Sequence, residues 1–305
     1  MPSEQVQGSW LGAAKRWLRG SKRHEVQQEQ QKQFQTELDA YIESVTAFNA
    51  SQANTAMLES IRAYNHLVVD AFNKIKPLKG ASILDVGASP HGYAMERCFS
   101  LQTARYVGIG LDIEAAEDIR IGDSEGRLLY MNAQDLAFED QTFDMVMSMS
   151  TFEHIADVPK ALAEIHRVLR PGGTCLLSFE PLWTCAYGHH LHHFGEVSNL
   201  LPAWAHLLWD RDRMRAELRD KWPENAPITL DDAIEWTYDS VAINRIGIAQ
   251  MRQHFHDCPM RVEWIIPMMH EVDQPDMLVA AQARTGLPAE DLNTKGLTLL
   301  LHRDA

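Results

Sequence analysis

SILDVGASPHGYAMERC, residues 82–98, has the pattern of a strand, a tight turn and the start of a helix. In open α/β sheets a cofactor is held at such a strand-to-helix turn. Gly87 lets a ligand approach the backbone closely because it has no Cβ, and Asp85 can accept hydrogen bonds or contact a cationic group. Ser89 and His91 occupy the turn, so it is not the GxGxxG loop of a dinucleotide-binding site.

Apolar runs and a helical segment alternate through the next hundred residues. The predicted strands after the opening one are 106–113, 128–131, 143–149 and 174–179. A helix over 158–169, capped by Asp157, precedes the last of them. Strands that alternate with helices at this spacing predict a mostly parallel sheet with right-handed crossovers. Asp112 ends the second strand, where such a fold holds ribose hydroxyls.

Two amphipathic helices are predicted before the opening stretch, over 25–48 and 57–75, with a break near 49–54. Both show a narrow apolar stripe with spacings of three and four residues. We therefore predict an N-terminal helical extension over 1–78 and a second domain over 79–305. The helices also offer a surface for a homo-oligomer.

A short basic segment over 10–23 has tryptophans on its apolar face. The pattern is compatible with docking on the body of the protein or on a second subunit. It is also compatible with a helix that lies at a membrane surface.

Charge and cysteine content narrow the class of protein. The chain has 305 residues and a net charge of −14, which argues against a general nucleic-acid binder. Its four cysteines are scattered without a CxxC pair, which predicts a reducing compartment and argues against a cysteine zinc site. With no apolar run long enough to span a bilayer and no signal-peptide core, we predict a cytoplasmic protein.

Four segments together resemble the class I S-adenosylmethionine-dependent methyltransferases, close to the broad type 11 group. They are ILDVGAS, YVGIGLDI, NAQDLAFEDQTFDMVMSMSTFEHI and EIHRVLRPGG, in this order between residues 82 and about 181. The resemblance implies S-adenosylmethionine as the cofactor and a Rossmann-like, mostly parallel sheet of seven strands. The segments 261–267 and 297–302 would then complete that sheet as an antiparallel edge pair.

The resemblance also implies which residues bind the cofactor. They are Asp85, Gly87, Ala88, Asp112, Ile113, Gln134, Asp135, Leu136 and Ser150. Asp85 and Gly87 would lie by the methionine part, Asp112 would hold the ribose hydroxyls and Asp135 would face the adenine amino group. The family loop is usually DxGxGxG, whereas the loop of this chain is closer to the DxGxxPGG form.

About 80 residues separate the fifth strand from residue 261, more than one crossover requires. We predict that 182–258 is a mainly helical insertion on the substrate side, with helices over 204–222 and 233–255, the second broken near Gly247. Trp183, Tyr187 and Trp204 are candidates for stacking on a sugar or aromatic acceptor.

Histidines are the candidate catalysts. His154 follows the fourth strand, and His189 and His190 open a His-rich run, HHLHH, after the fifth. One of them could act as a general base. Several could hold a divalent metal, although HHxHH is not a defined metal spacing and we assign no metal ligand. They could also be structural or substrate-contact groups.

The sequence therefore predicts methyl transfer to a small-molecule or glycan acceptor, at oxygen, with a histidine as general base. The alternatives are a metal-assisted O-methyltransferase that uses residues 189–193, an RNA methyltransferase, and a non-catalytic cofactor-binding module. The DxGxxP-like loop prompts the RNA alternative. The acidic charge and the lack of a Lys-Asp-Lys-Glu arrangement at the strand ends count against it.

Overall fold

The computed structural model describes residues 29–52, 54–114 and 116–305, which divide into two compact units. Unit 1 holds the described residues up to Lys79 with Tyr93–Ala104 and Asp118–Gly126, and unit 2 holds Gly80–Gly92, Arg105–Glu117 and Arg127–Ala305. The basic segment 10–23 lies outside the described residues. The predicted division at residue 78 stays a prediction.

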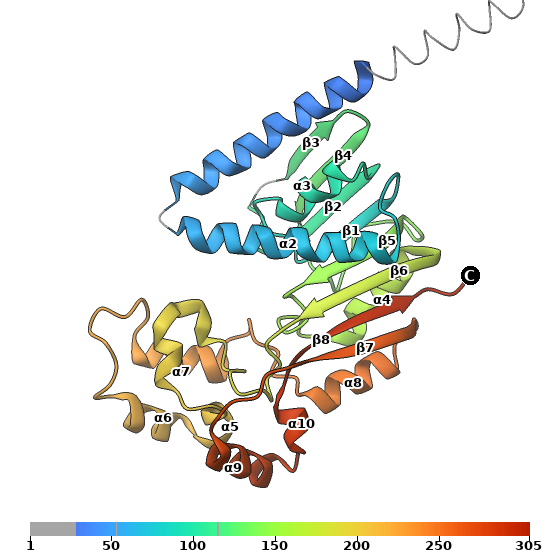
Figure 1. Ribbon diagram of the computed structural model, residues 1–305. Helices are drawn as coiled ribbons and strands as arrows, with labels where there is room; N and C mark the ends of the chain where they lie inside the picture. Colours follow the sequence, from blue (N-terminus) through green and yellow to red (C-terminus); the bar gives the residue numbers. More distant parts are fainter. Residues whose placement is uncertain (1–28, 53, 115) are drawn as a thin grey trace, which may run out of the picture. The chain divides into compact units, whose positions relative to one another are not determined.

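The strands form one mixed sheet, so the predicted α/β class is confirmed (Figure 1). They are β1 (Ser82–Val86), β2 (Arg105–Gly110), β3 (Glu117–Ile121), β4 (Ser124–Tyr130), β5 (Phe143–Met149), β6 (Leu169–Phe179), β7 (Arg261–Met269) and β8 (Thr294–His302). Their order in the sheet is β3-β4-β2-β1-β5-β6-β8-β7. The sheet has eight strands where seven were predicted. The additional strand is β3, which the two residues Gly122 and Asp123 join to β4.

β1 lies inside the sheet and is buried along its whole length. It pairs in parallel with β2 on one side and β5 on the other, and β5 pairs in parallel with β6. β8 runs antiparallel to both β6 and β7, as predicted for the late strands. Because the parallel strands end at one edge of the sheet, the loops that follow β1, β2 and β5 gather there.

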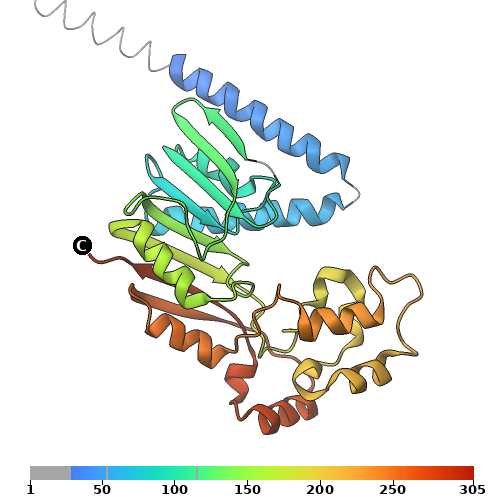
Figure 2. The same cartoon turned by 180° about the vertical axis from the view of Figure 1, so that it is seen from behind.

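Two helices of unit 2 cover one face of the sheet (Figure 2). α4 (Val158–Val168) begins as predicted, since the Asp157 side chain accepts a hydrogen bond from the Lys160 amide and a proline stands in the first turn. α8 (Ile248–His256) begins directly after Gly247, near the predicted break, but the preceding helix already ends at Asp239, so the prediction of helix over 240–246 is wrong. Both helices bury apolar side chains in the main core with those of β1, β5 and β6.

The insertion is mainly helical, as predicted. Its elements are η1 (Leu191–Leu200), α5 (Ala205–Leu208), α6 (Arg211–Leu218), α7 (Leu230–Asp239) and α8. The predicted helix over 204–222 is wrong as one element. Asp210 interrupts it, because its carboxylate accepts from the Arg213 amide and starts α6 anew.

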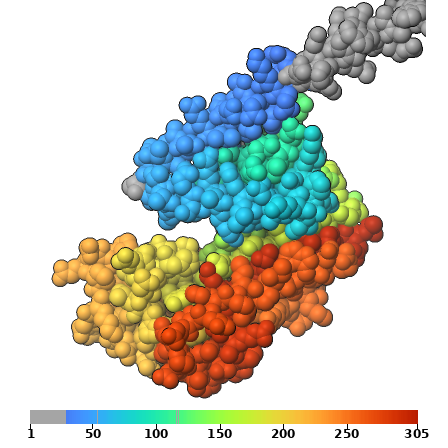
Figure 3. All heavy atoms as spheres, in the orientation of Figure 1, coloured from blue at the N-terminus to red at the C-terminus, as the bar shows by residue number. Residues whose placement is uncertain are grey.

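The C-terminal helices of unit 2 are α9 (Pro275–Thr285) and α10 (Ala289–Leu292). α9 packs against α5, and in Figure 3 the yellow surface of the insertion adjoins the orange-red surface of the C-terminal segment. The insertion is therefore held by the segment between β7 and β8 as well as by the core.

In unit 1 a helix over 29–51 precedes α2 (Thr55–Ile75) and α3 (Tyr93–Ser100). α2 buries Leu58, Asn65, Val69 and Phe72. Met57, Ile61 and Ile75, which belong to the predicted apolar stripe, are exposed. The buried face of the helix is therefore offset from the predicted one by about one residue.

An ion pair with a buried carboxylate joins α2 and α3. Arg62 donates from Nε and Nη2 to the two carboxylate oxygens of Glu96, at 2.9 and 2.8 Å. A buried carboxylate requires such a partner.

None of the helices in the described part of the chain combines the length and apolarity needed to cross a membrane.

Candidate active site

A cavity of about 220 Å³ lies where β1, β2, β4 and β5 end. It is lined by Val86, Gly87, Ile109, Gly110, Leu111, Met131, Asn132, Ala133, Gln134, Thr151, His154, Ile155, Ala156 and Val241. Three of the predicted site residues, Gly87, Gln134 and His154, are among them. The four strand-end loops thus meet as the fold class requires, and Val241 of the insertion joins them.

Gly87 forms the narrowest part of the turn after β1. Its φ is +81°, and a Cβ placed there would lie 1.9 Å from Thr151 Oγ1. The amides of Gly87 and Ala88 both donate to the Ile109 carbonyl, at 2.7 and 2.9 Å. The turn is therefore closed by the backbone of β2, and only glycine fits beside Thr151.

Asp85 is a buried carboxyl at the end of β1. Tyr106 donates its hydroxyl proton to Oδ2, and Oδ1 has no partner among the described residues. Burial raises the pKa of Asp85 to about 7, while the Tyr106 hydrogen bond acts in the opposite direction. A half-satisfied buried carboxyl at this position suits a ligand that brings a positive charge or N–H donors.

The other predicted cofactor residues lie around the cavity without lining it. Asp112 and Asp135 are exposed, Ile113 and Leu136 are buried, and Ser150 is exposed with a φ of +48°. The sequence pattern missed Asn132 and Thr151, which do line the cavity. Each lies within two residues of a predicted one, so the pattern located the loops but not which side chain of each loop turns inward.

Gln134 also links two loops. Its Oε1 accepts from the Asp157 amide at 2.5 Å, which ties the loop after β4 to the start of α4. The Gln134 amide in turn donates to Asn132 Oδ1 at 2.9 Å.

His154 lines the cavity from the loop after β5. Its Nδ1 lies 2.6 Å from the Ala242 carbonyl oxygen, which can only accept, so Nδ1 carries the proton. Nε2 is then the basic nitrogen, and it has no hydrogen-bond partner in the part of the chain described. Burial lowers the pKa of His154 below its ordinary 6.5. The ring is neutral at pH 7 and can take a proton.

Three further histidines surround His154. The ring centroids of His190 and His193 lie 5.3 and 6.2 Å from that of His154, and those of His192 and His193 are 4.3 Å apart. Burial lowers the pKa of His190 to about 3 and of His192 to about 4. His190 donates from Nδ1 to the Gly188 carbonyl at 2.7 Å, which leaves Nε2 without a partner among the described residues.

His189 belongs to a different group of rings. It packs against Tyr187 and His206, with ring centroids 6.1 and 5.6 Å away. Within residues 29–305, apart from 53 and 115, no group of three His, Cys, Asp or Glu side chains is arranged to hold a metal ion.

Residues 84–177 match the family described as Methyltransferase domain. These residues form a class I S-adenosylmethionine-dependent methyltransferase domain. An uncharacterized methyltransferase of Mycobacteroides abscessus is 26% identical over 79% of this chain and 92% of its own length. The ubiquinone biosynthesis O-methyltransferase of Mesorhizobium japonicum is 26% identical over 55% of this chain and 67% of its own.

Three more mycobacterial relatives are matched over 63% of their own length, less than two thirds. Among solved structures, the match to an S-adenosylmethionine-dependent methyltransferase from Mesorhizobium loti covers 78% of this chain and 96% of the chain in that structure. Its TM-score is 0.47 and its sequence identity 15%.

The cofactor of the methyltransferase is S-adenosylmethionine, and the cavity residues fit it. Gly87 lines the cavity, and the Asp85 Oδ1 atom lacks a partner among the described residues, as a site for a cationic amino acid moiety requires. Gly110 and Asn132 also line the cavity.

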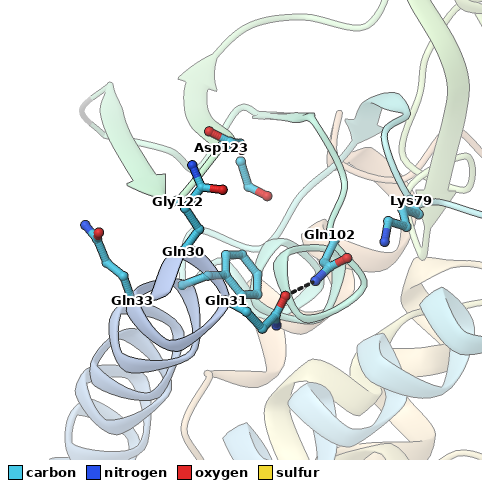
Figure 4. A pocket seen from close by; sticks show the side chains of 9 residues that line it. Gln30, Gln31, Gln33, Lys79, Gln102, Gly122 and Asp123 are labelled. Atoms are coloured by element: carbon cyan, nitrogen blue, oxygen red, sulfur yellow. Dashed lines mark hydrogen bonds between the residues drawn. The ribbon is translucent and has the colours of Figure 1, made fainter. Parts of the chain in front are cut away.

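A second and larger cavity of the methyltransferase, about 580 Å³, lies within unit 1 (Figure 4). Gln30, Gln31 and Gln33 from the helix over 29–51 line it, and Gln102 Nε2 donates to Gln31 Oε1 at 3.4 Å. It contains none of the predicted cofactor or catalytic residues, so its volume does not make it the active site.

Proposed function

We propose that this methyltransferase transfers a methyl group to an oxygen atom of a small hydroxyl-bearing acceptor, with His154 as the general base. The observation that carries the proposal is the fixed tautomer of His154. Its Nδ1–H is held by the Ala242 carbonyl at 2.6 Å, so the basic Nε2 belongs to a residue that lines the cofactor cavity. A neutral imidazole at this place is suited to accept a hydroxyl proton.

S-adenosylmethionine supplies a methyl group that its sulfonium already activates. The acceptor oxygen forms the new O–CH₃ bond while the S–CH₃ bond breaks, and the hydroxyl proton passes to Nε2 of His154. The products are the methyl ether or ester, S-adenosylhomocysteine and a proton that the imidazole returns to solvent. The protein must mainly align the two reactants and remove this proton.

Nine residues are proposed to hold the cofactor: Asp85, Gly87, Ala88, Asp112, Ile113, Gln134, Asp135, Leu136 and Ser150. Gly87 and Gln134 line the cavity, and Asp85 has an unpartnered oxygen, which supports their assignment. The exposed carboxylate of Asp112 at the end of β2 is suited to ribose hydroxyls.

The acceptor side is proposed to be the insertion over 182–258. Trp183 and Tyr187 are half-buried and available to stack on an acceptor ring. His190 has an unpartnered Nε2 and a ring 5.3 Å from that of His154, which supports a role beside the base. His189 faces His206 instead, so we propose a binding role for it. The O-methyltransferase name of the Mesorhizobium japonicum relative supports oxygen as the acceptor atom.

The test combines binding and turnover. Calorimetry measures the affinity of the purified protein for S-adenosylhomocysteine, and radiolabelled S-adenosylmethionine reports methyl transfer to a panel of phenols, carboxylic acids and sugars. His154→Gln should keep the cofactor affinity and lose most turnover, whereas His256→Gln, an exposed histidine beside Asp257, should lose neither. Methylation at nitrogen, or full turnover by His154→Gln, would disprove the proposal.

A further inference from the structure

Arg245 is a cation without a carboxylate partner among the described residues. Its Nε donates to the Thr237 carbonyl at 3.1 Å and its Nη1 to the Ile243 carbonyl at 3.0 Å. Nη2 is buried and has no partner in the described part of the chain. A guanidinium stays charged in proteins, so one side of this charge is held by neutral carbonyls and the other side is unsatisfied.

The Arg245 guanidinium lies over an aromatic ring. Its Cζ is 5.7 Å from the centroid of the Trp183 ring, and the His206 ring meets Trp183 edge to face at 4.7 Å. Trp183 directly follows the Glu-Pro-Leu segment after β6 and is only half-buried. The stacked guanidinium is therefore held beside a ring that solvent can reach.

Two buried histidines also have unpartnered nitrogens: His206, which meets the Trp183 ring, and His189, whose ring lies 5.6 Å from that of His206. His206 donates from Nε2 to the Trp183 carbonyl at 2.7 Å, so its Nδ1 is an acceptor without a donor among the described residues. His189 Nδ1 accepts from the Leu191 amide at 3.0 Å, so its Nε2 carries the proton and has no acceptor there. Both side chains are almost fully buried.

Three unsatisfied polar groups in one cluster are unusual, since buried polar groups are normally hydrogen-bonded and cost free energy when they are not. Two of them are donors, Arg245 Nη2 and His189 Nε2, and one is an acceptor, His206 Nδ1. An anionic oxygen would satisfy the donors, and a hydroxyl group would satisfy the acceptor.

The cluster is close to the reacting centre in the same unit. His189 adjoins His190, whose ring is 5.3 Å from His154. The Ala242 carbonyl accepts the hydrogen bond from His154, and Ala242 is three residues before Arg245. The Cα atoms of Ala242 and Arg245 therefore lie at most ~11 Å apart. This is a distance that one small molecule can span.

We propose that Arg245, with His189 and His206, binds the anionic group of the methyl acceptor, so that the substrate is a small hydroxylated acid. The inference rests on the proposed function and names its substrate class. A protein with a net charge of −14 repels anions in general. The half-buried cation of Arg245, with its buried Nη2, is therefore the feature that would select an acid over its neutral analogue.

The test measures binding, without turnover. With S-adenosylhomocysteine present, calorimetry compares 4-hydroxybenzoate with 4-hydroxybenzamide, glucuronate with glucose, and glucose 6-phosphate with glucose. At least one acid should bind at least tenfold more tightly than its neutral partner. Arg245→Gln should reduce this preference to twofold or less, and Arg245→Lys should reduce it at least fivefold because lysine lacks the fork of donors.

Arg213→Gln is the matched control. Arg213 also lies over a tryptophan, with Cζ 5.5 Å from the Trp209 ring, but it is exposed and near Glu217. This variant should keep the acid preference. Equal binding of acids and neutral partners by the unaltered protein, or an unchanged preference in both Arg245 variants, would overturn the inference.

The affinity for S-adenosylhomocysteine separates the two proposals. If it is retained while no acid is preferred, the substrate class is wrong and methyl transfer to oxygen stands. If the unaltered protein binds no S-adenosylhomocysteine, the proposed function itself fails.

Discussion

His154 Nδ1 lies 2.6 Å from the carbonyl oxygen of Ala242, so a loop of the sheet and a loop of the insertion set the orientation of one imidazole together. The contact decides which nitrogen is basic. It also places the proposed base beside residues 241–245, the segment that carries Arg245 and Val241, which lines the same cavity as His154.

The pH dependence of turnover should reflect the lowered pKa of His154. A general base must be unprotonated, and burial moves its pKa below the ordinary 6.5. The rate constant kcat/KM should therefore stay level as the pH falls to 6.5 and decline only below it. His154→Gln should lower kcat about 10²- to 10⁴-fold. An acid limb centred at or above pH 6.5 would contradict the assignment.

Asn244 should act as a positioning residue for the catalytic loop. Its Nδ2 donates to the carbonyls of Phe152 and Ile155, at 2.7 and 2.9 Å, on either side of His154. Asn244→Ala should lower kcat by about tenfold and the free energy of unfolding by about 1–3 kcal/mol.

Asn244→Asp should be worse than the alanine variant, since a carboxylate cannot donate to a carbonyl. Kinetics and urea unfolding measure both effects. Gln253→Ala removes an exposed amide bonded to Asp257 and should change neither. If Asn244→Ala lost stability but kept kcat, the residue would be merely structural.

Gly87→Ala should abolish most cofactor affinity. The added Cβ would lie 1.9 Å from Thr151 Oγ1, and the φ of +81° is unfavourable for any L side chain. We expect at least a tenfold weaker Kd for S-adenosylhomocysteine by calorimetry.

Gly172→Ala controls for the backbone conformation alone. Gly172 has a φ of +75° and nothing within 4 Å of an added Cβ. That variant should lose about 1–2 kcal/mol of stability and keep its affinity. Equal affinities in the two variants would show that the turn after β1 does not contact the cofactor.

Asp85 should make the ligand-free protein less stable as the pH rises. Its folded pKa is about 7, above its ordinary value of 3.8. The folded state thus holds a proton that the unfolded chain has already released. This costs stability progressively between pH 3.8 and 7, and the loss is complete above 7.

Asp85→Asn should remove that dependence while still accepting the Tyr106 hydroxyl proton. The gain in free energy of unfolding over the unaltered protein should grow from pH 4 to 7 to at most ~4 kcal/mol and then level off. Urea unfolding at several pH values measures it. A constant difference between the two proteins would mean that Asp85 is ionised throughout.

Local patterns predicted most of the elements. The Asp157 cap, the break at Gly247 and the alternation of apolar runs with helices all appear in the structure. The helix over 204–222 was wrong because a good capping residue, Asp210, competed with a weak amphipathic pattern. The buried face of α2 differs from the predicted stripe, and its ion pair of Arg62 with Glu96 joins residues 34 positions apart, which no local pattern records.

The sequence by itself determined the methyltransferase class, since the turn at Asp85-Val86-Gly87 and the acids that end the next strands are local signals in a specific order. Only the tertiary structure decided which nitrogen of His154 is basic and that Arg245 lies over Trp183, whose ring also meets His206. Those contacts join residues up to 88 positions apart. They depend on how the insertion packs, and no periodic pattern in the chain records that packing.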